Sequence, residues 1–136
     1  MMKKIILSVF MVMAFMALPL QVLPRVEEFL SGKSWCGTVK EKEYGTYPVY
    51  MSIQCLEKGS FCGTIQYPSL RCGGMLIYTG KTKGAHVFTE KIQWGRDKCY
   101  DGGRISVSPG AGDSLKWLWF YPDGRLNVQG KVHVLR

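Results

Sequence analysis

The chain has 136 residues and a formal net charge of +8, and 46% of its residues are hydrophobic and 21% charged. A chain of this length holds a single domain, which excludes Rossmann and TIM-barrel enzymes because those folds need far more residues. The ordinary apolar content and the 12% of aromatic residues argue against disorder, and the 16 glycines argue against a helical bundle.

The first segment has the pattern of an export signal. Two lysines precede an uncharged, mostly apolar run over residues 5–18, and Pro19 follows it. A basic start before a short apolar core is typical of a secretory signal peptide, whereas a transmembrane helix needs about 20 apolar residues. We therefore expect residues 1–23 to be a signal peptide, cleaved after Ala17 or Ala14, with an uncleaved membrane anchor as the alternative.

In the remainder of the chain, turn-forming residues are spaced as in an all-β domain. We expect residues 24–34 to form a short lead-in segment and residues 35–136 to form a single domain. From residue 35 onward, Gly, Pro, Asp and Ser recur about every ten residues between short apolar or alternating runs, as in an all-β sandwich or barrel. The expected strands are 35–40, 47–56, 61–67, 72–79, 85–94, 103–108, 114–121 and 125–135.

Several of these strands alternate an apolar with a polar face, which is typical of antiparallel sheets. In the fifth, Glu90 and Trp94 fall on the same face as His86, Phe88 and Ile92. Eight consecutive strands with short links predict an up-and-down meander, and closing such a meander into a barrel removes its exposed edges. We expect a small antiparallel eight-stranded barrel, with a β-sandwich as the alternative.

The cysteine count indicates disulfides. Five cysteines follow the expected signal peptide, and in an exported chain of this size they predict disulfides with at least one thiol left over. The absence of a Cys-x-x-Cys pattern and the presence of only two histidines argue against a structural zinc site or a thioredoxin-like site. We therefore expect no metal and no cofactor.

Two cysteine-glycine blocks carry a resemblance to a known family. They are Tyr-Pro-Ser-Leu-Arg-Cys-Gly-Gly at 67–74 and Cys-Tyr-Asp-Gly-Gly at 99–103, with Phe-Thr-Glu-Lys-Ile at 88–92 between them. Over about residues 35–134 the chain resembles a poorly characterised bacterial exported β-domain, a resemblance that implies no established activity. Gly-Lys-Ser-Trp-Cys-Gly at 32–37 also resembles the Gly-x-Trp start of lipocalin-like (calycin) barrels, displaced by one residue.

The blocks also suggest cysteine pairs. We expect Cys72 to pair with Cys99. Cys55 and Cys62 flank residues 57–60, whose composition is typical of a hairpin turn. If the two cysteines were opposite each other in that hairpin, the apolar face of one strand would pair with the polar face of the other. The register of paired strands normally aligns their apolar faces. A disulfide between Cys55 and Cys62 is therefore one possibility, and a pairing of Cys36 with either of them is the other.

No catalytic motif is evident. Carboxylates at Glu90, Asp97, Asp101 and Asp113, or serines 106 and 108 with histidines 86 and 133, supply candidate groups, but sequence spacing does not show that they converge. Glu90 is the most informative, because a carboxylate on an apolar face has a raised pKa. The alternative is that Glu90 pairs with an arginine inside the barrel or lies at its rim. We expect that the protein is not an enzyme.

The aromatic run Trp117–Tyr121 predicts either a stacking platform for a ligand or barrel core. We expect an exported protein, periplasmic or secreted, that binds a small apolar or sugar ligand at the barrel. The candidate ligand-binding residues are Trp94, Trp117, Trp119, Tyr67, Tyr78 and Glu90. The alternative is a lysozyme-inhibitor-like protein that binds a protein through its loops. The 18 basic residues are scattered along the sequence, so we expect no nucleic-acid partner. We expect contact with a membrane only if the signal segment stays uncleaved.

Overall fold

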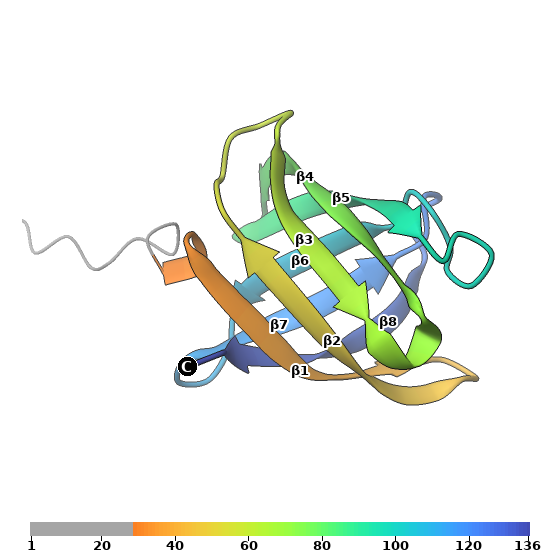
Figure 1. Cartoon of the computed structure of the whole chain (residues 1–136). Coiled ribbons are helices and arrows are strands. Elements are labelled where there is room, and N and C mark those ends of the chain that lie inside the picture. Colours follow the sequence, from red (N-terminus) through yellow and green to blue (C-terminus); the bar gives the residue numbers. More distant parts are fainter. Residues whose placement is uncertain (1–28) are drawn as a thin grey trace, which may run out of the picture.

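Eight antiparallel strands close into a barrel in the computed structural model, which describes residues 29–136 (Figure 1). Neighbours in the barrel are neighbours in the chain, and β1 pairs with β8 to close it. The predicted up-and-down barrel is confirmed, and the sandwich alternative is wrong. The strands are β1 (Lys33–Glu41), β2 (Gly45–Ile53), β3 (Phe61–Tyr67), β4 (Cys72–Thr82), β5 (Ala85–Trp94), β6 (Arg104–Pro109), β7 (Ser114–Phe120) and β8 (Leu126–Val134).

The predicted strands match these bounds closely, with two larger differences. β2 ends at Ile53 rather than at residue 56, because the N–H groups of Gln54 and Cys55 both turn to the carbonyl oxygen of Cys62 (2.7 and 3.3 Å). β4 continues to Thr82 because a register shift absorbs Thr79 and the pairing with β5 resumes at Gly80. The expected signal peptide, residues 1–23, lies outside the described residues.

The first described residues, 29–32, cover one end of the barrel. Leu30 is fully buried, its carbonyl oxygen accepts the indole N–H of Trp35 (3.4 Å), and the ring of Phe29 packs edge-on against the same indole (5.2 Å). We call this end the closed end. The opposite end, the mouth, is formed by the loops 42–44, 68–71, 95–103 and 121–125.

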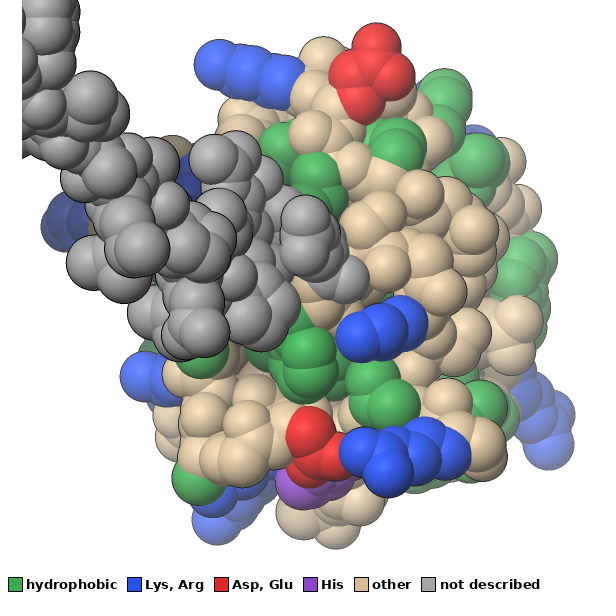
Figure 2. Space-filling view, turned by 90° about the vertical axis from the view of Figure 1, so that its left-hand side faces the viewer, with side chains coloured by type: hydrophobic (Ala, Val, Ile, Leu, Met, Phe, Trp, Pro, Cys, Tyr) green, Lys and Arg blue, Asp and Glu red, His purple; other side chains and the backbone are tan. Residues whose placement is uncertain are grey.

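The surface at the closed end carries its basic side chains apart from one another. In Figure 2, lysine and arginine side chains are spread around the visible part of this face, with hydrophobic side chains, neutral polar surface and backbone between them. Arg136 at the described C-terminus is paired with Asp113 (3.3 Å). On this face the positive charge therefore forms no single patch.

Within residues 29–136, no helix is long and apolar enough to cross a bilayer.

Trp94, which was expected to face inward with Glu90, is on the outside of the barrel. The pairing of β4 with β5 shifts register between Gly73 and Gly74, so that Gln93 is an extra residue and the alternation reverses at the end of β5. Trp94 is 47% exposed, and its indole lies so close to Gly73 that a Cβ there would come within 2.7 Å of it. The prediction of an interior Trp94 is wrong.

Both disulfides are present. Cys72 pairs with Cys99 as predicted, and of the two alternatives for the remaining cysteines the pair Cys55–Cys62 is correct, leaving Cys36 as the free thiol of the described chain. The expected conflict of register does not arise. β2 and β3 pair with their apolar faces aligned, and since β2 ends at Ile53, Cys55 is free to turn back to Cys62, which a bulge in β3 directs inward.

Candidate functional site

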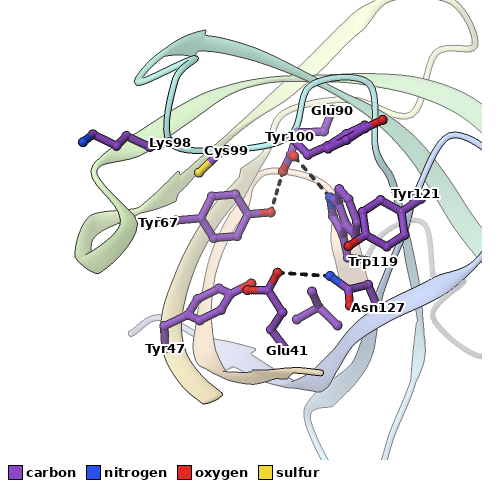
Figure 3. Close-up of a pocket in the computed structure, with 11 residues that line it drawn as sticks. Glu41, Tyr47, Tyr67, Glu90, Lys98, Cys99, Tyr100, Trp119, Tyr121 and Asn127 are labelled. Carbon is purple, nitrogen blue, oxygen red and sulfur yellow. Dashed lines mark hydrogen bonds between the residues drawn. The ribbon is translucent and has the colours of Figure 1, made fainter. Parts of the chain in front are cut away.

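A cavity of about 190 Å³ opens at the mouth of the barrel (Figure 3). Strands β1, β2, β3, β5, β7 and β8 and two loops contribute to its wall, so residues from the whole length of the domain meet there. The cavity is lined by Glu41, Tyr47, Tyr67, Glu90, Lys98, Cys99, Tyr100, Trp119, Tyr121, Asn127 and Val128. Aromatic rings and carboxylates thus dominate its wall.

Glu90 is the central polar group of the cavity. Its side chain is only 2% exposed, and both carboxylate oxygens accept hydrogen bonds: Oε2 from the hydroxyl of Tyr67 (2.5 Å) and Oε1 from the indole N–H of Trp119 (3.2 Å). Figure 3 shows the tyrosine and the indole converging on the carboxylate from two sides. The backbone of Glu90 is held by Gly103 and Gly102, through bonds of 2.8 and 3.1 Å. Glu90 is therefore fixed rather than free to swing into solvent.

The environment of Glu90 raises the pKa of its carboxyl from the ordinary 4.5 to about 7. Burial is the main cause, and the negative charge of Asp101 adds to it, whereas the hydrogen bonds from Tyr67 and Trp119 favour the ionised form and oppose the rise. No ion pair within residues 29–136 includes Glu90. The alternative in which Glu90 pairs with an arginine in the barrel therefore does not hold.

Gly103 determines where the indole of Trp119 lies. A Cβ atom at position 103 would come within 2.3 Å of the indole ring, so only glycine lets the ring lie against the backbone there. The same residue accepts the N–H of Glu90 through its carbonyl oxygen. The paired glycines of the second cysteine-glycine block thus set the geometry of the Trp119–Glu90 hydrogen bond.

The loop 95–103 forms one side of the mouth and is anchored at several points. Cys99 ties it to the start of β4, and the carboxylate of Asp101 accepts the N–H of Ile92 (2.8 Å). Between these anchors, Tyr100 packs edge-on against Trp119 (6.4 Å) and Tyr121 (5.4 Å). The disulfide therefore holds an aromatic side chain in the wall of the cavity.

A second carboxylate lies across the cavity from Glu90. Glu41, at the end of β1, accepts a hydrogen bond from the side-chain amide of Asn127 (3.0 Å), and the hydroxyl of Tyr47 is directed to the same carboxylate. Asn127 is directed inward because the pairing of β7 with β8 shifts register at that point.

Two buried tyrosines lie between the carboxylates. Burial, followed by the charges of Glu41 and Glu90 respectively, raises the pKa of Tyr47 and of Tyr67. Both hydroxyls therefore stay protonated at neutral pH, and that of Tyr67 donates a hydrogen bond to Glu90. Their rings pack edge to face, with centroids 6.0 Å apart.

The structure brings together three of the six residues predicted to bind a ligand. Tyr67, Glu90 and Trp119 line the cavity. Trp117 is buried beneath it, with its ring centroid 6.5 Å from that of Tyr67, and is part of the core. Tyr78 is buried toward the closed end, where its hydroxyl lies 2.7 Å from Nδ1 of His86. Trp94 is outside, as described above.

Sequence reasoning missed other wall residues, among them Glu41, Tyr47, Lys98, Tyr100 and Asn127. One signal for four of them was available: in an up-and-down barrel, the ends of odd strands and the starts of even strands meet at the same end. Glu41, Tyr47 and the loop containing Lys98 and Tyr100 all follow from that rule. Asn127 does not, because its inward direction depends on a bulge.

Within the described part of the chain, no three His, Cys, Asp or Glu side chains gather closely enough to hold a metal ion. Comparisons of the chain with known protein families, with curated proteins and with solved structures found no match.

Proposed function

We propose that this protein is a non-enzymatic binding protein of an exported compartment, periplasmic or secreted, and that it holds a small ligand in the cavity at the mouth of the barrel. The observation that carries the proposal is the buried carboxylate of Glu90 in an aromatic cavity, without a cationic side chain to neutralise it within residues 29–136. A buried, unpaired carboxylate costs folding free energy, and such costs are concentrated at functional sites. The two disulfides suit an oxidising compartment.

The size of the cavity limits the ligand. A dry cavity of about 150 Å³ holds one benzene molecule. The mouth cavity, at about 190 Å³, therefore accommodates a single ring or a headgroup of similar size. Below it the barrel is filled by buried side chains, including Trp117, Phe88 and Ile105, which leaves no room for an acyl chain or a haem. A monosaccharide or a small substituted ring matches this size.

Filling the cavity tests the proposal. We expect single-ring probes, such as monosaccharides, phenols and benzylic compounds, to change the tryptophan fluorescence of the wild-type protein saturably. Val128 lines the cavity, so Val128→Phe should abolish the response, whereas Gln129→Phe, which places the same ring on the outer face of β8, should leave it unchanged. Circular dichroism checks that both variants fold.

Two results would contradict the proposal. An equal response from wild type and Val128→Phe would place the binding elsewhere. A flat response from wild type across the panel would favour the alternative, in which the mouth loops contact a protein. Tyr44 and Tyr100, which are 65% and 61% exposed at the mouth, would then be the contact residues to test.

The raised pKa of Glu90 favours a second candidate, a small hydrolase that uses Glu90 as a general acid. Glu41 would then be the second carboxylate of the pair. The hydrogen bonds from Tyr67 and Trp119 occupy one site on each oxygen of Glu90, and a substrate would have to approach the remaining sites. If the wild-type protein cleaves a bound probe and releases a product, and Glu90→Gln does not, the result would support a hydrolase over a protein that only binds.

A further inference from the structure

We infer that the ligand of the mouth cavity is a small organic cation, a protonated amine or a quaternary ammonium group, held between the carboxylates of Glu90 and Glu41 and the surrounding aromatic rings. The inference rests on the proposed function and names the class of ligand. It follows from three features of the cavity: its unused acceptors, its ring faces and the engagement of the nearby cationic side chains.

Hydrogen-bond acceptors are in excess in the cavity. Three of its side-chain donors already serve the carboxylates: the hydroxyl of Tyr67 and the indole of Trp119 bond Glu90, and the amide of Asn127 bonds Glu41. A carboxylate offers about four acceptor sites, so each of the two retains unused capacity. A ligand that enters therefore meets negatively charged acceptors. A protonated amine can donate hydrogen bonds to them, a quaternary ammonium group can pair with their charge, and an anion can do neither.

The rings of the cavity add a second attraction for positive charge. Tyr47 and Tyr67 come from β2 and β3, Trp119 from β7 and Tyr121 from the loop after β7. The rings pack edge to face, with centroids 5.0 Å apart in the Trp119–Tyr121 pair and 6.0 Å apart in the Tyr47–Tyr67 pair. Aromatic faces attract a cation that lies within about 6 Å of the centroid. The barrel already uses this interaction at its rim, where the guanidinium of Arg125 lies 5.0 Å from the ring centre of Tyr121.

Lys98, which lines the cavity, and Arg125, which lies over the ring of Tyr121, both have acidic partners outside the cavity. Arg125 is paired with Asp123 (2.6 Å), and Lys98 lies 3.9 Å from Asp97. Figure 3 shows the amine of Lys98 pointing away from the centre of the cavity. The positive net charge of the chain repels cations only weakly at this depth, since charges beyond the Debye length of about 8–10 Å are screened, whereas contacts inside a buried site are not.

The cation and a proton compete for Glu90. The groups that face this carboxylate are the hydroxyl of Tyr67, the indole of Trp119 and Asp101, with Glu41 and Tyr47 across the cavity. Since the pKa of Glu90 is about 7, a cation should bind with constant affinity well above pH 7. Its affinity should fall about tenfold for each pH unit below that value, because the proton must first be displaced.

Matched pairs of probes that differ only in charge test the inference. Choline and its neutral isostere 3,3-dimethylbutan-1-ol form one pair, and benzylamine and benzyl alcohol form the other. By titration calorimetry at about pH 8, each cation should bind at least tenfold more tightly than its neutral partner. In Glu90→Gln this preference should be reduced at least tenfold and the pH dependence lost. Glu57→Gln, which removes an exposed carboxylate near the closed end, should behave as wild type.

The outcomes separate this inference from the proposed function. If the neutral partners bind as tightly as the cations, the inference is overturned, whereas a small-ligand site at the mouth stands. If only a monosaccharide or another neutral probe binds, the cation inference is likewise overturned and the small-ligand site at the mouth stands. If no probe of either kind binds, both proposals fail. A preference for cations that survives in Glu90→Gln would also overturn the assignment of the site to this carboxylate.

Discussion

The free energy of unfolding is expected to fall by about 3 kcal/mol, through Glu90 alone, as the pH rises from about 4.5 to above 7. The folded-state pKa of Glu90 is about 7, and unfolding restores the ordinary value of 4.5. Between these values the folded chain retains a proton that the unfolded chain has lost. The stabilisation is therefore complete below pH 4.5 and is lost as the pH rises through 7.

Glu90→Gln isolates this effect from the titration of other groups. The glutamine carbonyl can accept the indole N–H of Trp119, and its amide can donate to the hydroxyl oxygen of Tyr67, so both contacts are kept, the second with its direction reversed. Urea unfolding of both proteins at intervals between about pH 4 and pH 8 should show the variant gaining about 3 kcal/mol relative to wild type. A difference that stays constant with pH would contradict the raised pKa.

Removing the disulfide between Cys72 and Cys99 should cost about 3–4 kcal/mol of stability, because the bridge closes a loop with a sequence separation of 27. Cys72→Ala, Cys99→Ala and the double variant should be destabilised alike, since either change breaks the bridge. Removing the bridge between Cys55 and Cys62 should cost less, about 2–3 kcal/mol, because their separation is only 7.

Thermal unfolding of these variants provides the measurement. Thiol titration of the unfolded wild-type chain first establishes the bridges, with one reactive thiol, that of Cys36, expected. The Cys72 and Cys99 variants should also lose the rigid position of Tyr100 at the mouth, because the loop 95–103 is no longer tied to β4. Unchanged melting temperatures in both would mean that this bridge does not stabilise the fold.

The fold was predictable because most of each strand follows local rules. The alternation of Leu115, Trp117 and Trp119 survives in the structure, and the Gly- and Pro-containing links are short enough to force neighbouring strands to pair. Three departures from the alternation share one cause. At Cys62, Gln93 and Asn127 an extra residue enters a strand and reverses the alternation beyond it, and no local preference in the sequence marks those positions.

The candidate site was predictable only in part, for the same reason. Glu90 and Trp119 stood out as a carboxylate and an indole on apolar faces, and both line the cavity. Trp94 was placed wrongly because of the bulge at Gln93. The hydrogen bond between Glu90 and Trp119 joins strands that are not neighbours in the barrel, and it depends on the contact of the indole with Gly103. Contacts across a barrel interior have no signature in local sequence.

The most direct test of the mouth cavity as the binding site is the nuclear magnetic resonance spectrum of the tryptophan indole N–H groups during titration with the probe panel. The four tryptophans report on four places: Trp35 at the closed end, Trp117 in the core, Trp94 on the outer face and Trp119 on the cavity. We expect a saturable shift of the Trp119 signal, with those of Trp35 and Trp94 unmoved. A Trp119 signal that stays constant while a probe binds would contradict the account.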